Sequence, residues 1–287
     1  MSTSQLSSRR AALLSLPALA LLLPFLLAVV FILRFSLSEE AQAISGYTLA
    51  HYQALLDPFL LRSLVLTLKL AFLSTMICVV LAVPIAMLMA AIQTPLWRRV
   101  VTSMVLLPMI LNLLIQSYGW IMALGPKGVV NNLLLQMGLT TSPVQLLFNE
   151  LGILIGLVQT ALPLAVFPIL GAMRSISREY LEAADSLGAP AWRSFFSITL
   201  PLLKPGLIGA ASIVFAFNAS AFAVPLLMGG RRVQMLGVAI RDMVSPLYDW
   251  SGAAAAGVTL IFITIVIMGV ATWLTTGNTK SNKGAHA

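Results

Sequence analysis

The chain has 287 residues, of which 59% are hydrophobic and only 9% are charged, and its mean hydropathy is +0.98. Soluble domains carry about a quarter charged residues, so this composition excludes a soluble globular protein. The net charge of +8 could point to nucleic acid, but no basic run with interleaved aromatic residues occurs, and we expect no nucleic-acid partner. The single cysteine, Cys78, lies in an apolar run, which excludes a disulfide framework or a cysteine metal cluster.

Long apolar runs predict an all-α integral membrane protein with six transmembrane helices. The first run, Ala11–Leu33, follows two arginines and mimics a signal peptide. The hydrophobic region of a signal has only ~7–15 residues, so we expect a retained first helix. Five further spans are expected at about 63–91, 100–124, 151–172, 206–228 and 253–276. The second run exceeds a ~30 Å hydrocarbon core, so Arg62 and Lys69 can extend from it into the outer interface.

Several polar and aromatic residues lie inside the predicted spans. Polar side chains that face hydrocarbon are costly, so these residues should face other helices or a solute path. The candidates for a translocation path are Asn112, Gln116, Tyr118, Trp120, Gln159 and Asn218. Hydrogen bonds that only hold the helices together would explain the same polar residues, and an interfacial aromatic belt would explain Tyr118 and Trp120. Four prolines, Pro84, Pro108, Pro163 and Pro168, are predicted to kink their helices.

A polar segment at about 174–204 separates the fourth and fifth apolar runs and predicts a short amphipathic helix. Ser177 can cap the start of this helix, Gly188 can adopt the left-handed conformation that ends it, and Pro190 prevents its continuation. The apolar face consists of Tyr180, Ala183, Ala184 and Leu187, and the acidic face consists of Glu179, Glu182 and Asp185. Such a helix at roughly 177–188 offers a surface to a soluble partner.

The pattern E-A-A, three residues, G, nine residues, I-x-L-P resembles the cytoplasmic loop of ABC importer permeases. Its specified positions are Glu182, Ala183, Ala184, Gly188, Ile198, Leu200 and Pro201. The resemblance runs from about Ile44 to Gly277, and within the family the chain is similar to the spermidine/putrescine-type permeases. Less specific local sequence matches support this subfamily, and they lie at 112–120, 149–150, 225–230 and 233–236. Asp249 and Ser251 depart from the Asn-Trp-Pro-like sequence that the subfamily usually shows.

The resemblance implies a cytoplasmic coupling helix between the fourth and fifth spans, which docks on an ATPase subunit. The implied coupling residues are Tyr180, Glu182, Ala183, Ala184, Asp185, Leu187, Gly188, Ile198, Leu200 and Pro201. It also implies two ATPase subunits that hold ATP and Mg, a second related permease, a periplasmic solute-binding protein and surrounding membrane lipid. The chain itself has no G-x-x-x-x-G-K-[ST] loop, and its two histidines, His51 and His286, are far apart. We therefore expect no enzyme activity, no cofactor and no metal in this chain.

Basic residues set the expected orientation. The 93–99 turn, the 174–204 loop and both ends of the chain are basic, so the positive-inside rule places them in the cytoplasm. The domains expected are a cytoplasmic tail at 1–10, a permease domain at 11–276 and a second cytoplasmic tail at 277–287. The expected location is the bacterial inner membrane. On the outer side Arg231, Arg232, Arg241 and Asp242 either contact the binding protein or are solvated loop charges.

A polyamine is the expected solute, although no acidic residue lies deep in a predicted span. A tight site for a polycation near the bilayer centre would include a carboxylate. Three explanations remain open. The path binds the solute weakly and leaves selectivity to the external binding protein, or the partner permease supplies the charge, or the solute is not a polyamine but a phosphonate, an opine or another small organic molecule. A transporter driven by an ion gradient and a membrane scaffold without transport are the remaining alternatives.

Overall fold

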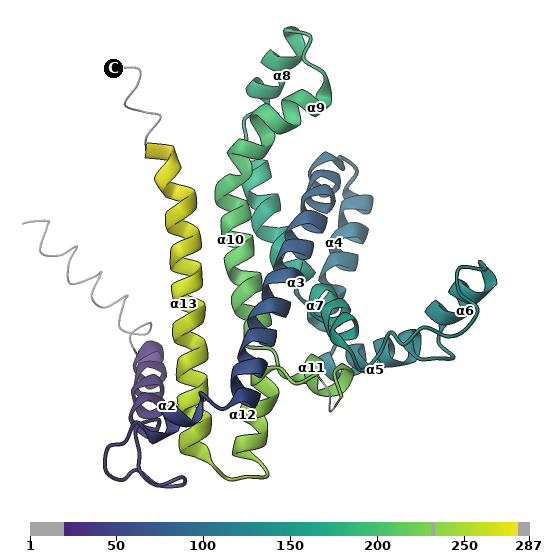
Figure 1. The fold of residues 1–287 in the computed structure, drawn as a ribbon. Coiled ribbons are helices and arrows are strands. Elements are labelled where there is room, and N and C mark those ends of the chain that lie inside the picture. Colours follow the sequence, from purple (N-terminus) through teal and green to yellow (C-terminus); the bar gives the residue numbers. More distant parts are fainter. Residues whose placement is uncertain (1–19, 231–232, 281–287) are drawn as a thin grey trace, which may run out of the picture. The chain divides into compact units, whose positions relative to one another are not determined.

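The computed structural model describes residues 20–230 and 233–280, and the side chains up to residue 273. The regular elements in these residues are helices, without a strand, which confirms the all-α class (Figure 1). The chain divides into two compact units. The first comprises Met1–Pro58 with Ile240–Thr259, and the second comprises Phe59–Ala239 with Leu260–Ala287.

The first unit is organised by a hydrogen-bonded loop that follows an apolar helix at Ala20–Phe35. The Arg34 guanidinium donates to the carbonyl of Gly46 at 3.0 Å and lies 4.1 Å from the centre of the Tyr47 ring. Ser38 accepts a hydrogen bond from the backbone N–H of Ser45 at 2.8 Å. The unit also contains the short helix α2 (Ala50–Ala54) and the beginning of α13 (Trp250–Lys280). The predicted tail at 1–10 and the start of the first span lie outside the described residues.

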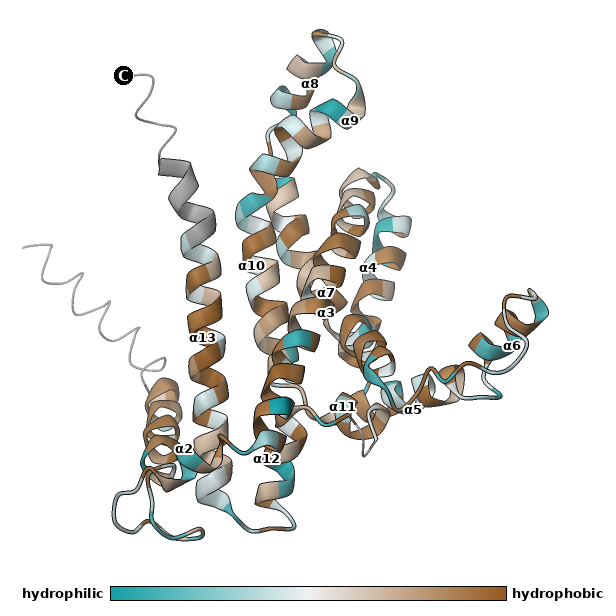
Figure 2. Cartoon of the chain, in the orientation of Figure 1, coloured by the Kyte–Doolittle hydropathy of each residue, from teal (hydrophilic) through white to brown (hydrophobic). Residues whose placement is uncertain are grey.

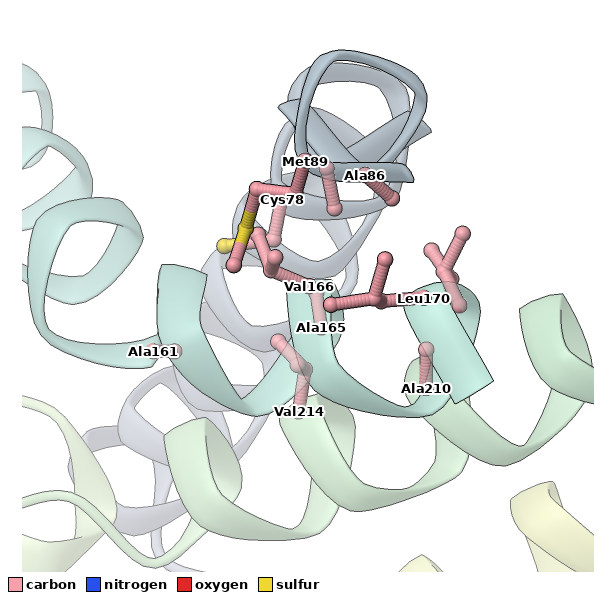
Figure 3. Packing of buried hydrophobic residues seen from close by; sticks show 11 residues of the cluster. Cys78, Ala86, Met89, Ala161, Ala165, Val166, Leu170, Ala210 and Val214 are labelled. Carbon is pink, nitrogen blue, oxygen red and sulfur yellow. The ribbon is translucent and has the colours of Figure 1, made fainter. Parts of the chain in front are cut away.

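The second unit is built around three long helices, α3 (Pro58–Ala91), α7 (Glu150–Arg174) and α10 (Leu200–Ala219). Small side chains fill much of the space between these helices, which lets the backbones approach closely (Figure 3). The fully buried members include Cys78, Ala82, Ala86, Ala161, Ala165 and Ala210. Cys78 is thus a small core residue, as its apolar surroundings in the sequence indicate.

Four helices in the described residues are long and apolar enough to cross a membrane. They cover Pro58–Ala91, Glu150–Arg174, Ala191–Ala219 and Trp250–Trp273, and a bent pair of helices would supply a fifth span. Apolar residues dominate the long helices, as Figure 2 shows. The predictions at 63–91, 151–172 and 253–276 lie within observed helices. The count of six spans stays a prediction.

The predicted continuous span at 100–124 is wrong, because the chain breaks after α4 (Pro95–Ile110). The next helix, α5 (Leu113–Leu124), leads on to α6 (Val129–Gln136). The segment Leu113–Gln136 is bent by 100° from α4. Leu111 and Asn112 have extended backbones with ψ of 141° and 133°. The apolar pattern runs through this point, so hydropathy alone could not locate the break.

The predicted span at 206–228 is also wrong at both ends. The helix begins earlier, because α9 (Ala191–Ser194) continues through a π-helical turn at Phe195–Thr199 directly into α10. It then ends at Ala219, and a separate short helix, α11 (Ala223–Met228), follows. Phe222 has a φ of −127°, outside the helical range, so the two helices cannot be continuous. Farther along the chain, α12 covers Leu236–Val244.

Replacing Gly206 by Ala tests the close packing of α7 against α10. A Cβ at this position would lie 2.4 Å from the Cβ of Ala172 and 3.3 Å from the carbonyl oxygen of Pro168. Overpacking of this kind costs about 1–3 kcal/mol, so Gly206→Ala should lower the melting temperature of the detergent-solubilised protein. Gly209→Ala is the control, since its Cβ would meet nothing within 4 Å. Equal melting temperatures for Gly206→Ala and Gly209→Ala would contradict this packing.

Candidate functional site

The polar loop between α7 and α10 folds around the short helix α8 (Arg178–Ser186). Its first turn is capped by Ser177, whose hydroxyl accepts a hydrogen bond from the Glu179 N–H at 3.3 Å. Glu179 also places a negative charge at the positive end of the helix dipole. The predicted N-cap is therefore confirmed.

The end of α8 is a Schellman motif centred on Gly188. The Gly188 N–H donates to the Asp185 carbonyl at 2.8 Å, and the Ala189 N–H donates to the Ala184 carbonyl at 3.0 Å. Gly188 has a φ of +71°, the left-handed conformation that glycine adopts without strain. Pro190 then has an extended backbone and precedes α9. The predicted stop at Gly188 and Pro190 is confirmed.

The two predicted faces of α8 are used differently from one another. Ala184 is buried, whereas Tyr180 is 57% exposed and Leu187 is 87% exposed, so the apolar stripe is only partly covered by this chain. Glu182 and Asp185 line a hollow of about 450 Å³ whose far wall includes Met87 of α3. Glu182 and Asp185 thus border the hollow next to α8, whereas Tyr180 and Leu187 are exposed on the surface of the helix.

The I-x-L-P part of the motif does not form a separate element. Ile198 lies in the π-helical turn, and Leu200 and Pro201 form the first residues of α10. Sequence reasoning missed two exposed aromatic residues in the same region, Trp192 at 67% and Phe196 at 60% exposure. Figure 1 shows α8 and α9 beyond one end of α10. Tyr180, Leu187, Trp192 and Phe196 are named the loop surface below.

The predicted path residues Asn112 and Gln116 hold the break between α4 and α5. The Asn112 side chain accepts a hydrogen bond from the Leu114 N–H at 2.8 Å and so caps α5. The Gln116 amide donates to the carbonyls of Pro108 and Leu111, at 2.5 and 2.8 Å. These contacts satisfy backbone groups that the break exposes, so both side chains have a structural role.

The other predicted path residues do not gather into one site. Asn218 is fully buried, and its amide donates to the Ser74 hydroxyl of α3 at 2.7 Å. The Trp120 indole donates to the Gln159 side chain at 3.3 Å, which joins α5 to α7. Tyr118 is 58% exposed. Asn112 with Gln116 and Trp120 with Gln159 therefore form two pairs, and Asn218 and Tyr118 belong to neither pair.

Two further features at helix ends were not predicted. Lys69 does not merely extend toward water, because its ammonium pairs with Glu150 at the start of α7 at 2.6 Å. A hollow of about 170 Å³ lies at the break between α10 and α11, where Thr160 of α7 and Leu113 of α5 also line it. Neither feature has a local sequence signal, since each brings together distant parts of the chain. The described residues contain no cluster of three metal-binding side chains.

Comparisons with known proteins agree on the kind of protein. The profile of the family described as "Binding-protein-dependent transport system inner membrane component" matches residues 82–279. The spermidine/putrescine transport system permease protein PotB of Haemophilus influenzae is 31% identical over 77% of this chain and 78% of its own length. PotB of Escherichia coli K12 is 32% identical over 76% of this chain and 78% of its own length.

Other similar proteins carry different solutes. The molybdenum transport system permease protein ModB of Azotobacter vinelandii is 31% identical over 72% of this chain and 91% of its own length. A solved bacterial ABC transporter involved in the import of the acidic polysaccharide alginate has a TM-score of 0.78 and 21% identity. It covers 96% of this chain and 99% of that chain, so the two share a fold.

Replacing Gln116 by Met tests the hydrogen bonds at the α4–α5 break. Methionine has a similar volume but no amide, so the carbonyls of Pro108 and Leu111 would lose their donor. An unsatisfied buried polar group costs about 1–3 kcal/mol, and the variant should melt at a lower temperature than the wild type in detergent. Gln136→Met, at an exposed position on α6, is the control. A melting temperature for Gln116→Met equal to that of the control would show that the break does not depend on this side chain.

Proposed function

The chain belongs to the family of binding-protein-dependent transport system inner membrane components, and on that premise we propose that it passes a polyamine through the membrane. Proteins of this kind are the permease subunits of ABC importers and not enzymes, so ATP hydrolysis falls to a separate ATPase subunit. A periplasmic binding protein would deliver a spermidine- or putrescine-like solute, and this chain would conduct it to the cytoplasm. The observation that carries the proposal is the identity of 31–32% to PotB permeases over three quarters of the chain.

We further propose that α8 is the coupling helix that docks on the ATPase. Three features support this: α8 is capped at both ends, the loop surface is exposed, and the segment after α8 runs without interruption into α10. The coupling residues would be those of the E-A-A…G…I-x-L-P motif together with Tyr180, Asp185 and Leu187. ATP and Mg would bind in two ATPase subunits, a second related permease would complete the pathway, and both ends of this chain would face the cytoplasm.

Among the predicted path residues, three are better candidates than the rest. Asn112, Gln116 and Asn218 form hydrogen bonds that stabilise breaks or helix contacts. The hydrogen bond between Trp120 and Gln159 joins two side chains and does not stabilise a helix break, and Tyr118 is exposed. Aromatic faces attract cations, which suits a polyamine. These three are therefore proposed to border the path.

A second candidate is the same importer class with a non-polyamine solute, such as a phosphonate, an opine, another small organic solute or a molybdenum compound. The similarity to ModB favours it. The positions of the acidic residues also favour it, because the described spans of the second unit offer no unpaired carboxylate to a cationic solute. In the second unit, Glu150 at the start of α7 is neutralised by Lys69, and the other acidic side chains belong to the 174–204 loop. Membership of the family sets aside the alternative driven by an ion gradient.

A solute screen separates the two candidates. The complex of this chain with its ATPase, partner permease and binding protein would be reconstituted in liposomes, and ATP hydrolysis measured with each solute. Spermidine or putrescine should stimulate hydrolysis several-fold, whereas phosphonates, opines and molybdate should not. Stimulation by one of the latter solutes, with none by polyamines, would replace the polyamine by that solute and leave the permease assignment intact.

Substitutions in α8 test the coupling proposal. Glu182→Lys reverses a charge at the hollow under α8, and Gly188→Val forces a β-branched residue into the left-handed conformation, at a cost of about 1–2 kcal/mol. Both variants should lose solute-stimulated ATP hydrolysis or co-purification of the ATPase. Glu179→Gln, which removes a charge on the same helix away from the hollow and keeps the shape of the side chain, should retain most of the stimulation. Normal stimulation in Glu182→Lys and Gly188→Val would refute the role of α8.

A further inference from the structure

The hollow at the α10–α11 break is small, and its wall is largely neutral. Its volume of about 170 Å³ compares with the ~150 Å³ of a protein cavity that binds benzene. It can therefore hold a group about the size of benzene, which corresponds to one end of a longer polyamine such as spermidine. The polar side chains on its wall are Thr160 and Ser220, and the aromatic ones are Phe217 and Phe222. This space is named the break hollow.

Both hydroxyl groups of the break hollow are committed as donors elsewhere. Thr160 donates to the carbonyl of Gly156 at 2.7 Å, and Ser220 donates to the carbonyl of Phe217 at 3.0 Å. A hydroxyl has one hydrogen and two lone pairs, so each oxygen has only acceptor capacity left for a ligand. The side chains of the hollow therefore accept hydrogen bonds from a ligand and do not donate to it.

The backbone at the break adds further acceptors. No hydrogen bond from the described residues reaches the carbonyl of Ala219, the last residue of the 20-residue helix α10, or that of its C-cap Ser220. The end of a helix carries partial negative charge and favours a cation. The beginning of α11 has partial positive charge, which would oppose the binding of a cation at the break. This charge is small, because α11 has only six residues and Pro225 lacks an N–H group.

We propose that the break hollow is a subsite for one protonated amine group of the solute, together with the methylene groups next to it. Ring faces of Phe217 and Phe222 attract the ammonium, and the hydroxyl and carbonyl oxygens accept its hydrogen bonds. The proposal rests on the polyamine function above and adds the group that recognises the solute. It also accounts for the absence of a carboxylate, because neutral acceptors and rings hold a cation weakly enough for it to move on.

Three small probes of equal length test the chemistry of the break hollow. Binding of n-butylammonium, n-butanol and butyrate to the detergent-solubilised importer complex would be measured by saturation-transfer NMR. The hollow variants are Thr160→Val, which removes an acceptor at constant shape, and Phe222→Leu, which removes a ring. We expect each variant to weaken butylammonium binding by about two- to fivefold and to weaken butanol binding less, because butanol donates a single hydrogen bond and carries no charge to interact with the Phe222 ring.

Two matched substitutions serve as controls. Thr259→Val removes a hydroxyl that donates to the carbonyl of Ala255 at 2.8 Å, the same bond that Thr160 makes. Phe262→Leu removes an exposed ring on α13. Neither residue lines the break hollow, so both controls should bind butylammonium as the wild type does. Equal losses in the controls and the hollow variants would overturn the proposal, as would butyrate or butanol binding that depends on Thr160 and Phe222 in the same way.

Uptake of labelled spermidine by the reconstituted complex separates this proposal from the proposed function. If spermidine is not imported but butylammonium binding still depends on Thr160 and Phe222, the subsite stands and the polyamine function fails. If spermidine is imported and butylammonium binding is the same in the wild type and both hollow variants, the subsite fails and the polyamine function stands.

Discussion

Inside a bilayer no water is available to satisfy a peptide group, so each interruption of a helix must be compensated by the protein itself. This constraint explains how most polar side chains of the second unit are used. Gln116 and Asn112 satisfy the groups exposed between α4 and α5, and Asn149 caps α7 through the Gly152 N–H. Polar residues in the spans therefore stabilise breaks and ends first. At the break between α10 and α11, the Ser220 hydroxyl donates to the Phe217 carbonyl, but the carbonyls of Ala219 and Ser220 accept no hydrogen bond from the described residues.

Small residues make the rest of the arrangement possible. Alanines and a glycine at the contacts of α3, α7 and α10 bring the backbones close together, and larger apolar residues such as Val65, Phe72 and Val80 of α3 are exposed. In a membrane these exposed side chains suit lipid, which gives no drive to bury them between helices. Packing of small groups, a cluster of larger buried residues around Leu70, Ile153 and Met228, and a few buried hydrogen bonds hold the second unit together.

The sequence allowed prediction where the signal is local. Ser177, Gly188 and Pro190 act within a few residues of their positions, and their roles in the α8 loop are confirmed. The breaks after Ile110 and Ala219 were missed, because apolar residues continue on both sides of each. Gln116 is recognisable in the sequence as a polar residue within an apolar run. Its hydrogen bonds to the Pro108 and Leu111 carbonyls, however, depend on the 100° bend, which has no sequence pattern. Contacts such as Lys69–Glu150 join residues far apart in the chain and become visible only in the fold.

The uninterrupted run from Ala191 to Ala219 has a mechanical consequence. Its 29 residues span about 44 Å at ~1.5 Å per residue, with one end beside α8 and the other at the open carbonyls of the α10–α11 break. Such a rod acts as a lever: a tilt of about 5° about one end displaces the other by about 4 Å. A push on the proposed coupling helix α8 would then change the width of the break hollow, and bending along the way would be concentrated at the π-helical turn Phe195–Thr199.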